Sequence, residues 1–489
     1  MDRWTITLEP SGEPIFLQIA RAVARDVARG RLRPGDPLPG SRTFATTLGV
    51  HRNTVLAAYR ELEAQGYTES VPAKGTRVRF ELPDRSPRRP SRPSERDPQK
   101  SAFSLTPAPA DVLAIPPPRG AIALLGGLPD LRHVPATSLA RAYRRIATSK
   151  RAASLFGYGD ARGEAPLREA LAGLLARARG LAIDEDDIVM TRGSQMALFL
   201  AARAVVEPGD VVLVEALGYR PGWEAIRAAG AAIEPIAIDG GGIDVDAVRA
   251  RCRRGRVRAV YVTPHHQYPT TALLGSGRRL ALLEVAREHR LAILEDDYDH
   301  EFHYDGRPVL PLASADRDGS VIYFGTLSKI LAPALRVGFM VGPRPLLDRA
   351  AAHRAIIDRQ GDRVLEHALA DFIDEGELVR HARRMRRLYE GRRRALAAAL
   401  EQRLGGRVSF TLPVGGMALW AHIPGCDVEA LAARCAERGV VFQTAKRFTF
   451  DGKRRPYARL GFAAEPEARL DRAVDIIATA LSELPPHRR

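Results

Sequence analysis

Cysteine is nearly absent from this sequence, and its scarcity excludes several classes of protein. The 489 residues contain only Cys252, Cys426 and Cys435, and none of them forms a C-x-x-C pair. This usage argues against a disulfide framework or a zinc site, and it fits a reducing compartment. We therefore expect a cytoplasmic protein that has no metal site.

Long apolar runs are absent as well. The first ten residues, MDRWTITLEP, lack the apolar core of a signal peptide. No run approaches the roughly 18 uncharged apolar residues that a membrane helix needs. We expect neither secretion nor a membrane span. No internal repeat is visible, and the length indicates two or three domains.

Basic charge, by contrast, is plentiful. The formal net charge is +16, and residues 1–80 hold 12 Lys/Arg against 8 Asp/Glu. The segment 378–396 adds eight arginines against Glu390 alone. A polyanionic partner would explain this excess, and so would a proteome that favours arginine codons. The basic segment fits either a solvated helix face or a track for DNA phosphates built from Arg383, Arg384, Arg387 and Arg393.

Residue patterns divide the chain into three parts. Residues 10–80 contain three helical patterns over 13–66 and a short hairpin over 67–80. Residues 81–118 are rich in proline and charge, which is typical of a linker. Between 119 and 485, apolar strands such as DVVLVEA and LAILEDDY alternate with helices. This alternation predicts an α/β fold with a mostly parallel sheet.

The segment 38–78 has the pattern of a winged helix-turn-helix. A tight turn at Gly49 separates two helical patterns, and the second runs from about Arg52 to Gln65. His51 stands at the N-cap of that second helix, where it is a poor cap. The first helix is expected to bury Leu38, Phe44, Ala45 and Leu48. The residues expected to contact DNA are Arg42, Arg52, Asn53, Thr54 and, at the tip of the wing, Lys74.

One lysine in the larger part of the chain is a candidate for covalent chemistry. Lys329 lies in FGTLSKILAPALRVGF, residues 324–339, between small polar residues and Arg336. A lysine amine forms a Schiff base with an aldehyde when it is enclosed and can lose its proton. A lone lysine establishes nothing, so the interpretation depends on the residues that accompany it.

Those residues occur in the order that pyridoxal 5'-phosphate (PLP) chemistry requires. A phosphate dianion needs amide and hydroxyl donors at the start of a helix, and TRGSQMALFLAARAV offers them. The expected phosphate ligands are Gly193, Ser194, Gln195, Thr326, Ser328 and Arg336.

The pyridine ring of PLP needs a flat partner and a carboxylate that keeps its nitrogen protonated. Tyr219 is expected to stack on the ring, Asp296 to bind the nitrogen, and Tyr298 to bind the ring hydroxyl. Arg459 in YARLGF has the planar fork that suits an amino-acid carboxylate. Each residue alone also has an ordinary explanation as a helix cap, a core tyrosine or a surface arginine, but chance rarely gives the whole set in this order.

With these motifs, residues 120–485 resemble fold type I aminotransferases, and the whole chain resembles the MocR/GabR-type regulators of the GntR superfamily. The resemblance implies a large domain with a mixed, mostly parallel sheet, a small C-terminal α/β subdomain, and a head-to-tail homodimer with shared PLP sites. It also implies that Tyr158 of YGD reaches the neighbouring subunit's cofactor, and that Gln267 and Tyr268 of TPHHQYPTT lie beside the cofactor. Leu217 and Thr271 replace a proline and a glycine of the family, which leaves the effector open.

We expect a regulator in which PLP, alone or joined to an amine or amino-acid effector, sets the affinity for double-stranded operator DNA. The alternative is an active PLP-dependent aminotransferase with an appended DNA-binding module, because a fold does not settle activity. A dimerisation scaffold that has lost its cofactor is a third possibility, and the presence of Lys329, Asp296 and Arg336 argues against it.

Overall fold

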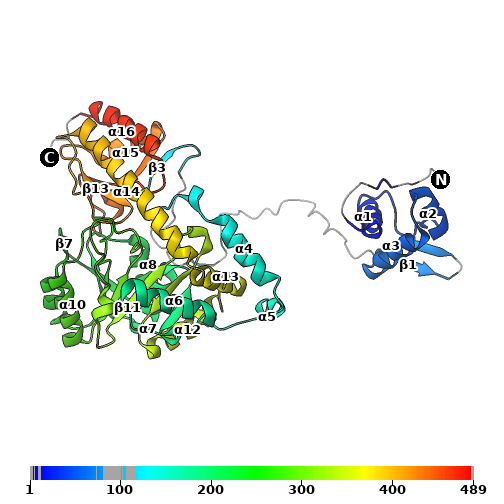
Figure 1. Ribbon diagram of the computed structural model, residues 1–489, viewed down its shortest axis with the longest axis horizontal. Coiled ribbons are helices and arrows are strands. Elements are labelled where there is room, and N and C mark those ends of the chain that lie inside the picture. The colour runs from blue at the N-terminus through cyan, green and yellow to red at the C-terminus, as the bar shows by residue number, and fades with distance from the viewer. Residues whose placement is uncertain are drawn as a thin grey trace. The chain divides into compact units, whose positions relative to one another are not determined.

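The chain forms two compact units, Met1–Pro107 and Ala108–Arg489 (Figure 1). The computed structural model describes residues 4, 6–8, 13–72, 74–80, 101, 103–105 and 117–485. Most of the expected linker, residues 81–118, lies outside the described residues, so the expected domain boundaries stay predictions. Within the described part of the chain, no helix is long and apolar enough to cross a membrane.

The N-terminal unit packs three helices around one core and adds a two-stranded wing (Figure 1). Its elements are α1 (Ile15–Ala28), α2 (Ser41–Leu48), α3 (Arg52–Ala64), β1 (Thr68–Val71) and β2 (Gly75–Val78). Val55 and Leu62 of α3 are fully buried, as their helical spacing predicts. The Tyr59 hydroxyl donates to the backbone oxygen of Pro39 at 2.6 Å, which satisfies the polar end of this core residue.

The turn between α2 and α3 follows the expected pattern with one correction. Gly49 ends α2 at a φ of 65°, a left-handed conformation that costs glycine nothing. His51 does cap α3, because its Nδ1 accepts from the backbone nitrogen of Asn53 at 3.2 Å. The assignment of Leu38 to the first helix is wrong. Leu38 is buried but precedes α2, since the following Pro39 disfavours helical backbone there.

A seven-stranded sheet with the order β4-β12-β11-β10-β9-β5-β6 forms the centre of the second unit. The strands β6, β5, β9, β10 and β11 run parallel to one another, and β12 runs antiparallel to β11 and β4. The mixed, mostly parallel sheet is therefore confirmed. The strands are β4 (Ile188–Thr191), β5 (Val211–Glu215), β6 (Ala232–Ile236), β9 (Val257–Val262), β10 (Ala292–Asp296), β11 (Val321–Thr326) and β12 (Gly338–Val341).

Helices cover both faces of this sheet, which is why its strands are apolar without alternation (Figure 1). Val212 and Leu294 pack in the core with α7 (Ser194–Val205), α8 (Arg220–Ala228) and α12 (Arg344–Ile357). Val211 and Ile293, one residue earlier on the same strands, pack on the opposite face. That face carries α6 (Ala165–Arg179), α9 (Val245–Cys252), α10 (Ser276–His289) and α13 (Arg363–Asp374).

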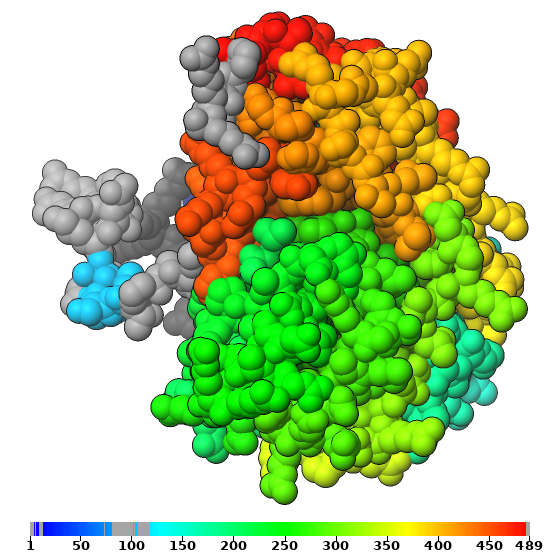
Figure 2. Space-filling model, turned by 90° about the vertical axis from the view of Figure 1, so that its left-hand side faces the viewer, coloured from blue at the N-terminus to red at the C-terminus, as the bar shows by residue number. Residues whose placement is uncertain are grey.

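The C-terminal subdomain is a four-stranded sheet with the order β13-β15-β14-β3. Its strands are β13 (Ala418–His422), β15 (Tyr457–Gly461), β14 (Val440–Thr444) and β3 (Ile122–Leu124), and its helices are α14 (Glu377–Leu404), α15 (Val428–Glu437) and α16 (Glu467–Ser482). The strand β3 comes from the start of the second unit and pairs parallel with β14. In Figure 2 the orange and red C-terminal segment lies against the green segment of the large sheet domain.

Shorter elements complete the second unit. The strands β7 (Ile238–Asp239) and β8 (Gly242–Ile243) form a small hairpin. The helices α4 (Ala136–Ala147) and α5 (Ala152–Leu155) precede α6, and α11 (Leu312–Ala315) precedes β11.

Candidate cofactor and effector site

Parallel strands bring the expected site residues to one edge of the large sheet. Loops that follow β5, β9, β10 and β11 carry Tyr219, Tyr268, Tyr298 and Lys329. The carboxyl ends of parallel strands share an edge, so these distant segments meet there. They line a pocket with a cavity volume of about 90 Å³, formed by Gly126, Gly127, Ser194, Tyr219, Tyr261, Thr263, Tyr268, Asp296, Tyr298 and Lys329.

Lys329 presents its amine to this pocket. The Lys329 Nζ donates to the backbone oxygen of Gly127 at 2.8 Å. Burial, and after it the charge of Arg459, lowers the pKa of the Lys329 amine to about 8. A much larger share of the amine is therefore neutral near pH 7 than in an exposed lysine, and a nucleophilic amine must be neutral.

Asp296 faces the same pocket from the end of β10. Its Oδ2 accepts from the Tyr261 hydroxyl at 2.8 Å, whereas its buried Oδ1 has no hydrogen-bond partner among the described residues. Burial is the main cause that raises the pKa of Asp296 to about 6. A buried carboxylate oxygen without a donor is costly, so Oδ1 fits a protonated ring nitrogen.

The expected phosphate ligands gather at the start of α7. Gly193 caps this helix at a φ of 83°, and a Cβ there would lie 3.2 Å from the Arg336 guanidinium. The Ser328 hydroxyl is buried without a partner among the residues described, and Thr326 Oγ1 accepts from the backbone nitrogen of Ser328 at 3.1 Å. Backbone amides, a free hydroxyl and a guanidinium fit a phosphate dianion.

Three tyrosines line the aromatic side of the pocket. The rings of Tyr219 and Tyr268 meet edge to face at 5.5 Å, and those of Tyr268 and Tyr298 at 5.9 Å. The Tyr298 hydroxyl donates to the backbone oxygen of His266 at 2.9 Å, which leaves its lone pairs available as acceptors. Burial raises the pKa of both the Tyr219 and Tyr298 hydroxyls, so both stay protonated at neutral pH.

Arg459 on β15 is completely buried beside the pocket. Its Nε donates to the backbone oxygen of Pro269 at 3.3 Å, but within the described ranges neither Nη atom has a partner. Its guanidinium carbon lies 4.4 Å from the centre of the Tyr268 ring. Gly126 makes room for it, because a Cβ at that position would collide with Nη1. A buried guanidinium with free donors fits a carboxylate.

Several expected residues are not among those that line the pocket, and Gln267, Gln195 and Tyr158 make other contacts or are exposed. The Gln267 Nε2 donates to the backbone oxygens of Leu217 at 2.8 Å and Tyr268 at 2.7 Å, so this amide shapes its own loop. Gln195 is exposed on α7. Tyr158 is 77% exposed, and its ring lies 4.1 Å from the guanidinium of Arg359.

Thr271, which stands where the resembled family has a glycine, adopts a left-handed backbone conformation. Its φ is 64°, which is strained for a β-branched residue. Its backbone nitrogen donates to the backbone oxygen of Gln267 at 2.6 Å, and this bond closes the turn that carries Gln267 and Tyr268. The loop beside the pocket thus keeps its turn without the glycine.

Sequence reasoning missed part of the pocket lining. Tyr261 looks like an ordinary core residue of a buried strand, and only the pairing of Leu294 with Tyr261 places its hydroxyl near Asp296. The adjacent glycines in LLGGLPD were the one local signal for Gly126 and Gly127. Thr263 carries no such signal.

The expected DNA-contacting residues lie at the surface of the N-terminal unit. Arg52 and Asn53 are exposed in the first turn of α3, and Thr54 is half-buried. Arg42 is exposed on α2, and Lys74 lies at the exposed turn between β1 and β2. This is the surface that a winged helix-turn-helix presents to a major groove.

The basic segment 378–396 lies within α14, and its arginines divide into two groups. Arg383, Arg384 and Arg387 are exposed. Arg393 is only 1% exposed and contacts Asp305 Oδ2 at 2.6 Å, so its inclusion in a phosphate track is wrong. The ion pair inside the protein already uses this guanidinium.

Comparison with known proteins identifies the class of the chain. Residues 126–477 match the family of aminotransferases of class I and II, and residues 16–78 match the gntR family of bacterial regulatory proteins. The chain therefore belongs to the class I and II aminotransferase family and carries a GntR-type helix-turn-helix domain. Membership of this aminotransferase family implies dependence on PLP.

Individual relatives define the family more closely. Over 92% of its length the chain is 33% identical to the probable rhizopine catabolism regulatory protein MocR of Rhizobium meliloti, covering 90% of that protein. It is 31% identical to the HTH-type transcriptional regulator TauR of Rhodobacter capsulatus, with 97% of this chain and 98% of that protein covered. The chain is thus a DNA-binding transcriptional regulator of the MocR type, and the expected family is confirmed.

A solved structure gives the likeness in three dimensions. The α-aminoadipate aminotransferase LysN of Thermus thermophilus, in complex with N-(5'-phosphopyridoxyl)-L-leucine, superimposes with a TM-score of 0.69 and is 28% identical. The comparison covers 74% of this chain and 92% of LysN. The fold type I architecture of the second unit is therefore confirmed.

Proposed function

We propose that PLP held at Lys329, together with an amine or amino-acid effector, controls DNA binding by this regulator. The observation that carries the proposal is the pocket itself. It places an amine with a lowered pKa and a buried carboxylate oxygen without a partner at one sheet edge. Such groups are unfavourable unless a ligand uses them.

The residues of the pocket fit PLP at each of its functional groups. When bound, PLP supplies an aldehyde that joins an amine and a ring that withdraws electrons. Asp296 Oδ1 would hold the ring nitrogen and Tyr298 the ring hydroxyl. The phosphate would lie among the amides at the start of α7, the free Ser328 hydroxyl and Arg336.

Arg459 supports an effector that carries a carboxylate. Its two free Nη atoms form a planar pair of donors, the geometry that a carboxylate accepts in bidentate fashion. The charge of Arg459 also reaches Lys329, since it contributes to the lowered pKa of that amine. An amino acid would thus present its amine to the cofactor and its carboxylate to Arg459. The names of MocR and TauR do not identify the effector of this chain.

We further propose a homodimer with shared sites, and the exposed surface near α5 supports it. Tyr158, Phe156 and Ile356 are 77%, 70% and 83% exposed, and the Tyr158 ring contacts Arg359, three residues after Ile356 in the sequence. Tyr158 lies outside the pocket of its own chain, so its ring is available to a neighbouring subunit. A second copy of the chain would bury these side chains and place two DNA-binding units on one molecule.

An active aminotransferase is the second candidate, because Lys329, Asp296 and Tyr298 line one pocket and Arg459 is buried beside it. The GntR-type unit and the full-length likeness to regulators favour the regulatory role. Incubation of the PLP-loaded chain with excess amino donor and excess keto-acid acceptor, which returns the cofactor to PLP after each half-reaction, distinguishes the two. A regulator releases at most one equivalent of keto product per chain, and an enzyme releases many.

The test of the regulatory role is a DNA-binding titration. The affinity for a DNA fragment from upstream of the chain's own coding region should change when PLP is added. It should change again when the PLP-loaded chain is given an amine or amino acid that acts as the effector, identified by screening a panel of such compounds. Lys329→Ala should lose both responses, and Lys150→Ala, which removes an exposed lysine, should keep them. Equal responses from Lys329→Ala and the wild type would reject the proposal.

A further inference from the structure

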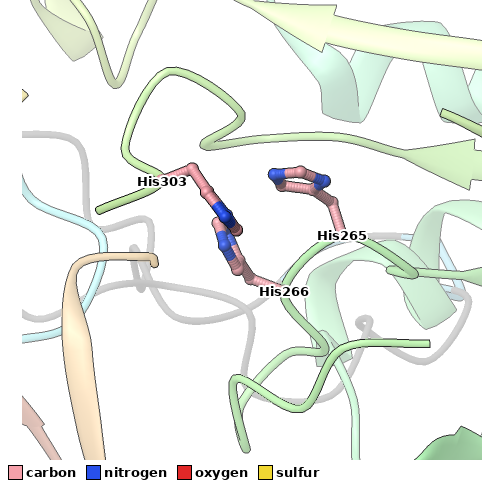
Figure 3. Close-up of side chains that lie close together, drawn as sticks. All are labelled: His265, His266 and His303. Carbon is pink, nitrogen blue, oxygen red and sulfur yellow. The ribbon is translucent and has the colours of Figure 1, made fainter. Parts of the chain in front are cut away.

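Four buried histidines lie behind the pocket, in the two loops that carry its aromatic residues. His265 and His266 follow β9, and His300 and His303 follow β10. All four are at most 6% exposed. Figure 3 shows the rings of His265, His266 and His303 close together, with one ring nitrogen of His265 turned toward the other two rings.

These histidines leave an unusual number of ring nitrogens without a partner. Within the described ranges, neither nitrogen of His265 has a hydrogen-bond partner, and His266 Nε2 and His303 Nδ1 have none either. One ligand nitrogen from each of the three residues lies within 4.8 Å of the others. A buried imidazole without a partner is costly, and three that converge are costlier still.

His266 already has the support that metal-binding histidines usually have. Its Nδ1 contacts Asp299 Oδ1 at 2.7 Å, and both side chains are almost fully buried. A carboxylate on one ring nitrogen fixes the tautomer and directs the other nitrogen, here Nε2, toward a metal.

We propose that His265 and His303 together with Nε2 of His266 bind a divalent transition metal, for which Zn²⁺ is the best match. Three imidazoles suit this ion, and a small inward shift would bring the nitrogens to the spacing of about 3.3 Å that tetrahedral zinc requires. Asp299 holds His266 in position and is not a ligand. The cysteine count gave no sign of this site, since all of its ligands are histidines.

A second set, His265 with Asp297 and His300, is the weaker candidate. Asp297 Oδ2 accepts from the Tyr323 hydroxyl at 2.7 Å, and it also lies 2.9 Å from His300 Nδ1 and 3.6 Å from Arg179 Nε. This carboxylate is therefore already neutralised. Its Oδ1 has no hydrogen-bond partner among the described residues, but a cation there would share the carboxylate with these existing contacts.

The metal would join the two loops that build the aromatic side of the pocket. One loop carries Tyr268 and the other carries Asp296 and Tyr298, and the Tyr298 hydroxyl already donates to the backbone of His266. Binding should therefore raise the melting temperature of the chain before any cofactor is added, because the metal binds only the folded state tightly.

The test uses the full chain without an affinity tag, stripped of metal and of PLP and titrated with Zn²⁺ against a chromophoric chelator. We expect one Zn²⁺ per chain. Affinity should fall at least tenfold in His265→Ala and His303→Ala and about 10- to 100-fold in Asp299→Asn. His289→Ala, which removes a half-buried histidine on α10, should bind as the wild type does.

Two outcomes would overturn the proposal. One is Zn²⁺ binding that is equal in the wild type and His303→Ala. The other is loss of binding in His300→Ala but not in His303→Ala, which would assign the metal to the second set. If His303→Ala fails to fold by circular dichroism, His303→Gln takes its place. The visible bands of Co²⁺ in the wild type then report coordination without any variant, and weak bands typical of six oxygen ligands would also reject the site.

Discussion

At the scale of single residues, the reactivity of Lys329 depends on its surroundings. Its amine lies in a pocket where burial and the Arg459 charge lower its pKa to about 8. Below that pH the amine is protonated and cannot attack a carbonyl. The rate of covalent PLP attachment to the apo chain should therefore rise with pH through about 8 and level off above it. Stopped-flow absorbance measures this rate, and a midpoint near 10, as in an exposed lysine, would show that the pocket does not tune the amine.

Arg459→Gln should have two effects that no other residue combines. Removal of the buried positive charge should move the pH midpoint of attachment upward, because Arg459 is one cause of the lowered Lys329 pKa. It should also weaken amino-acid effectors by about 1.5–3 kcal/mol, the usual value for hydrogen bonds to a charged group.

Amino-acid methyl esters are the matched control for Arg459. An ester lacks the carboxylate charge, so spectral titration should give it nearly equal affinity for Arg459→Gln and the wild type. Equal losses for acids and esters would show that Arg459 acts through the fold of the pocket.

At the scale of secondary structure, α3 is the element that should read DNA sequence. Arg52 lies exposed in its first turn, and its Nε also contacts the Ser41 hydroxyl of α2 at 3.3 Å. Arg52→Ala should reduce affinity for the specific fragment by about 1–3 kcal/mol and leave binding to unrelated DNA almost unchanged. Fluorescence anisotropy on both fragments measures the difference. Arg60→Ala, on the exposed surface two turns further along α3, should have a smaller and unselective effect.

Part of the basic charge of α14 is used in ion pairs inside the protein and is not available to DNA. Arg392 contacts Asp130 at 2.9 Å and Arg393 contacts Asp305, so both basic groups are neutralised inside the protein. We expect reversal of Arg383, Arg384 and Arg387 to Glu to leave the salt dependence of DNA binding unchanged, as for a solvated face. A drop in slope of about 0.9 for each arginine would instead assign phosphate contacts to this helix.

The sequence predicted elements well where a pattern is long and local. The strands of the large sheet are continuous apolar runs, and α3 has four core residues at helical spacing. The strand β3 escaped prediction because its three residues owe their conformation to pairing with β14, more than 300 positions away. Leu38 was misplaced for a local reason, the proline that follows it.

In the candidate site too, the sequence predicted what depends on local patterns and missed what depends on distant contacts. Lys329, Asp296 and Tyr219 follow apolar strands, so their meeting at one sheet edge could be expected. The sequence could not predict the free Nη atoms of Arg459 or the unpaired ring nitrogens of the histidines. The lack of a hydrogen-bond partner is visible only in the three-dimensional structure. Burial of Arg393 depends in the same way on Asp305, which lies 88 positions away.

At the scale of the whole molecule, the proposed dimer would complete the pocket with Tyr158 of the neighbouring subunit. Phe156, two residues before Tyr158, and Ile356 of α12 are both largely exposed. The double variant Phe156→Asp and Ile356→Asp should sediment as a monomer in analytical ultracentrifugation while the wild type sediments as a dimer. Buried charge at a former apolar contact disfavours association by several kcal/mol. A dimer in both proteins would place the interface elsewhere.

The two units of the chain carry different chemistry. The N-terminal unit presents a helix start to DNA, and the second unit holds a pocket with an amine, a carboxylate and a guanidinium whose polar atoms are available to a ligand. Dimerisation would give two DNA-binding units and two pockets, so a ligand that favours one dimer conformation also favours one DNA affinity.

The most direct test asks whether PLP is joined to Lys329. The apo chain is incubated with PLP, reduced with borohydride, digested and analysed by mass spectrometry. We expect one phosphopyridoxyl group on the peptide 324–339, at Lys329, and none in Lys329→Ala. A label spread over exposed lysines such as Lys150, or a chain that stays colourless with PLP, would contradict the central claim.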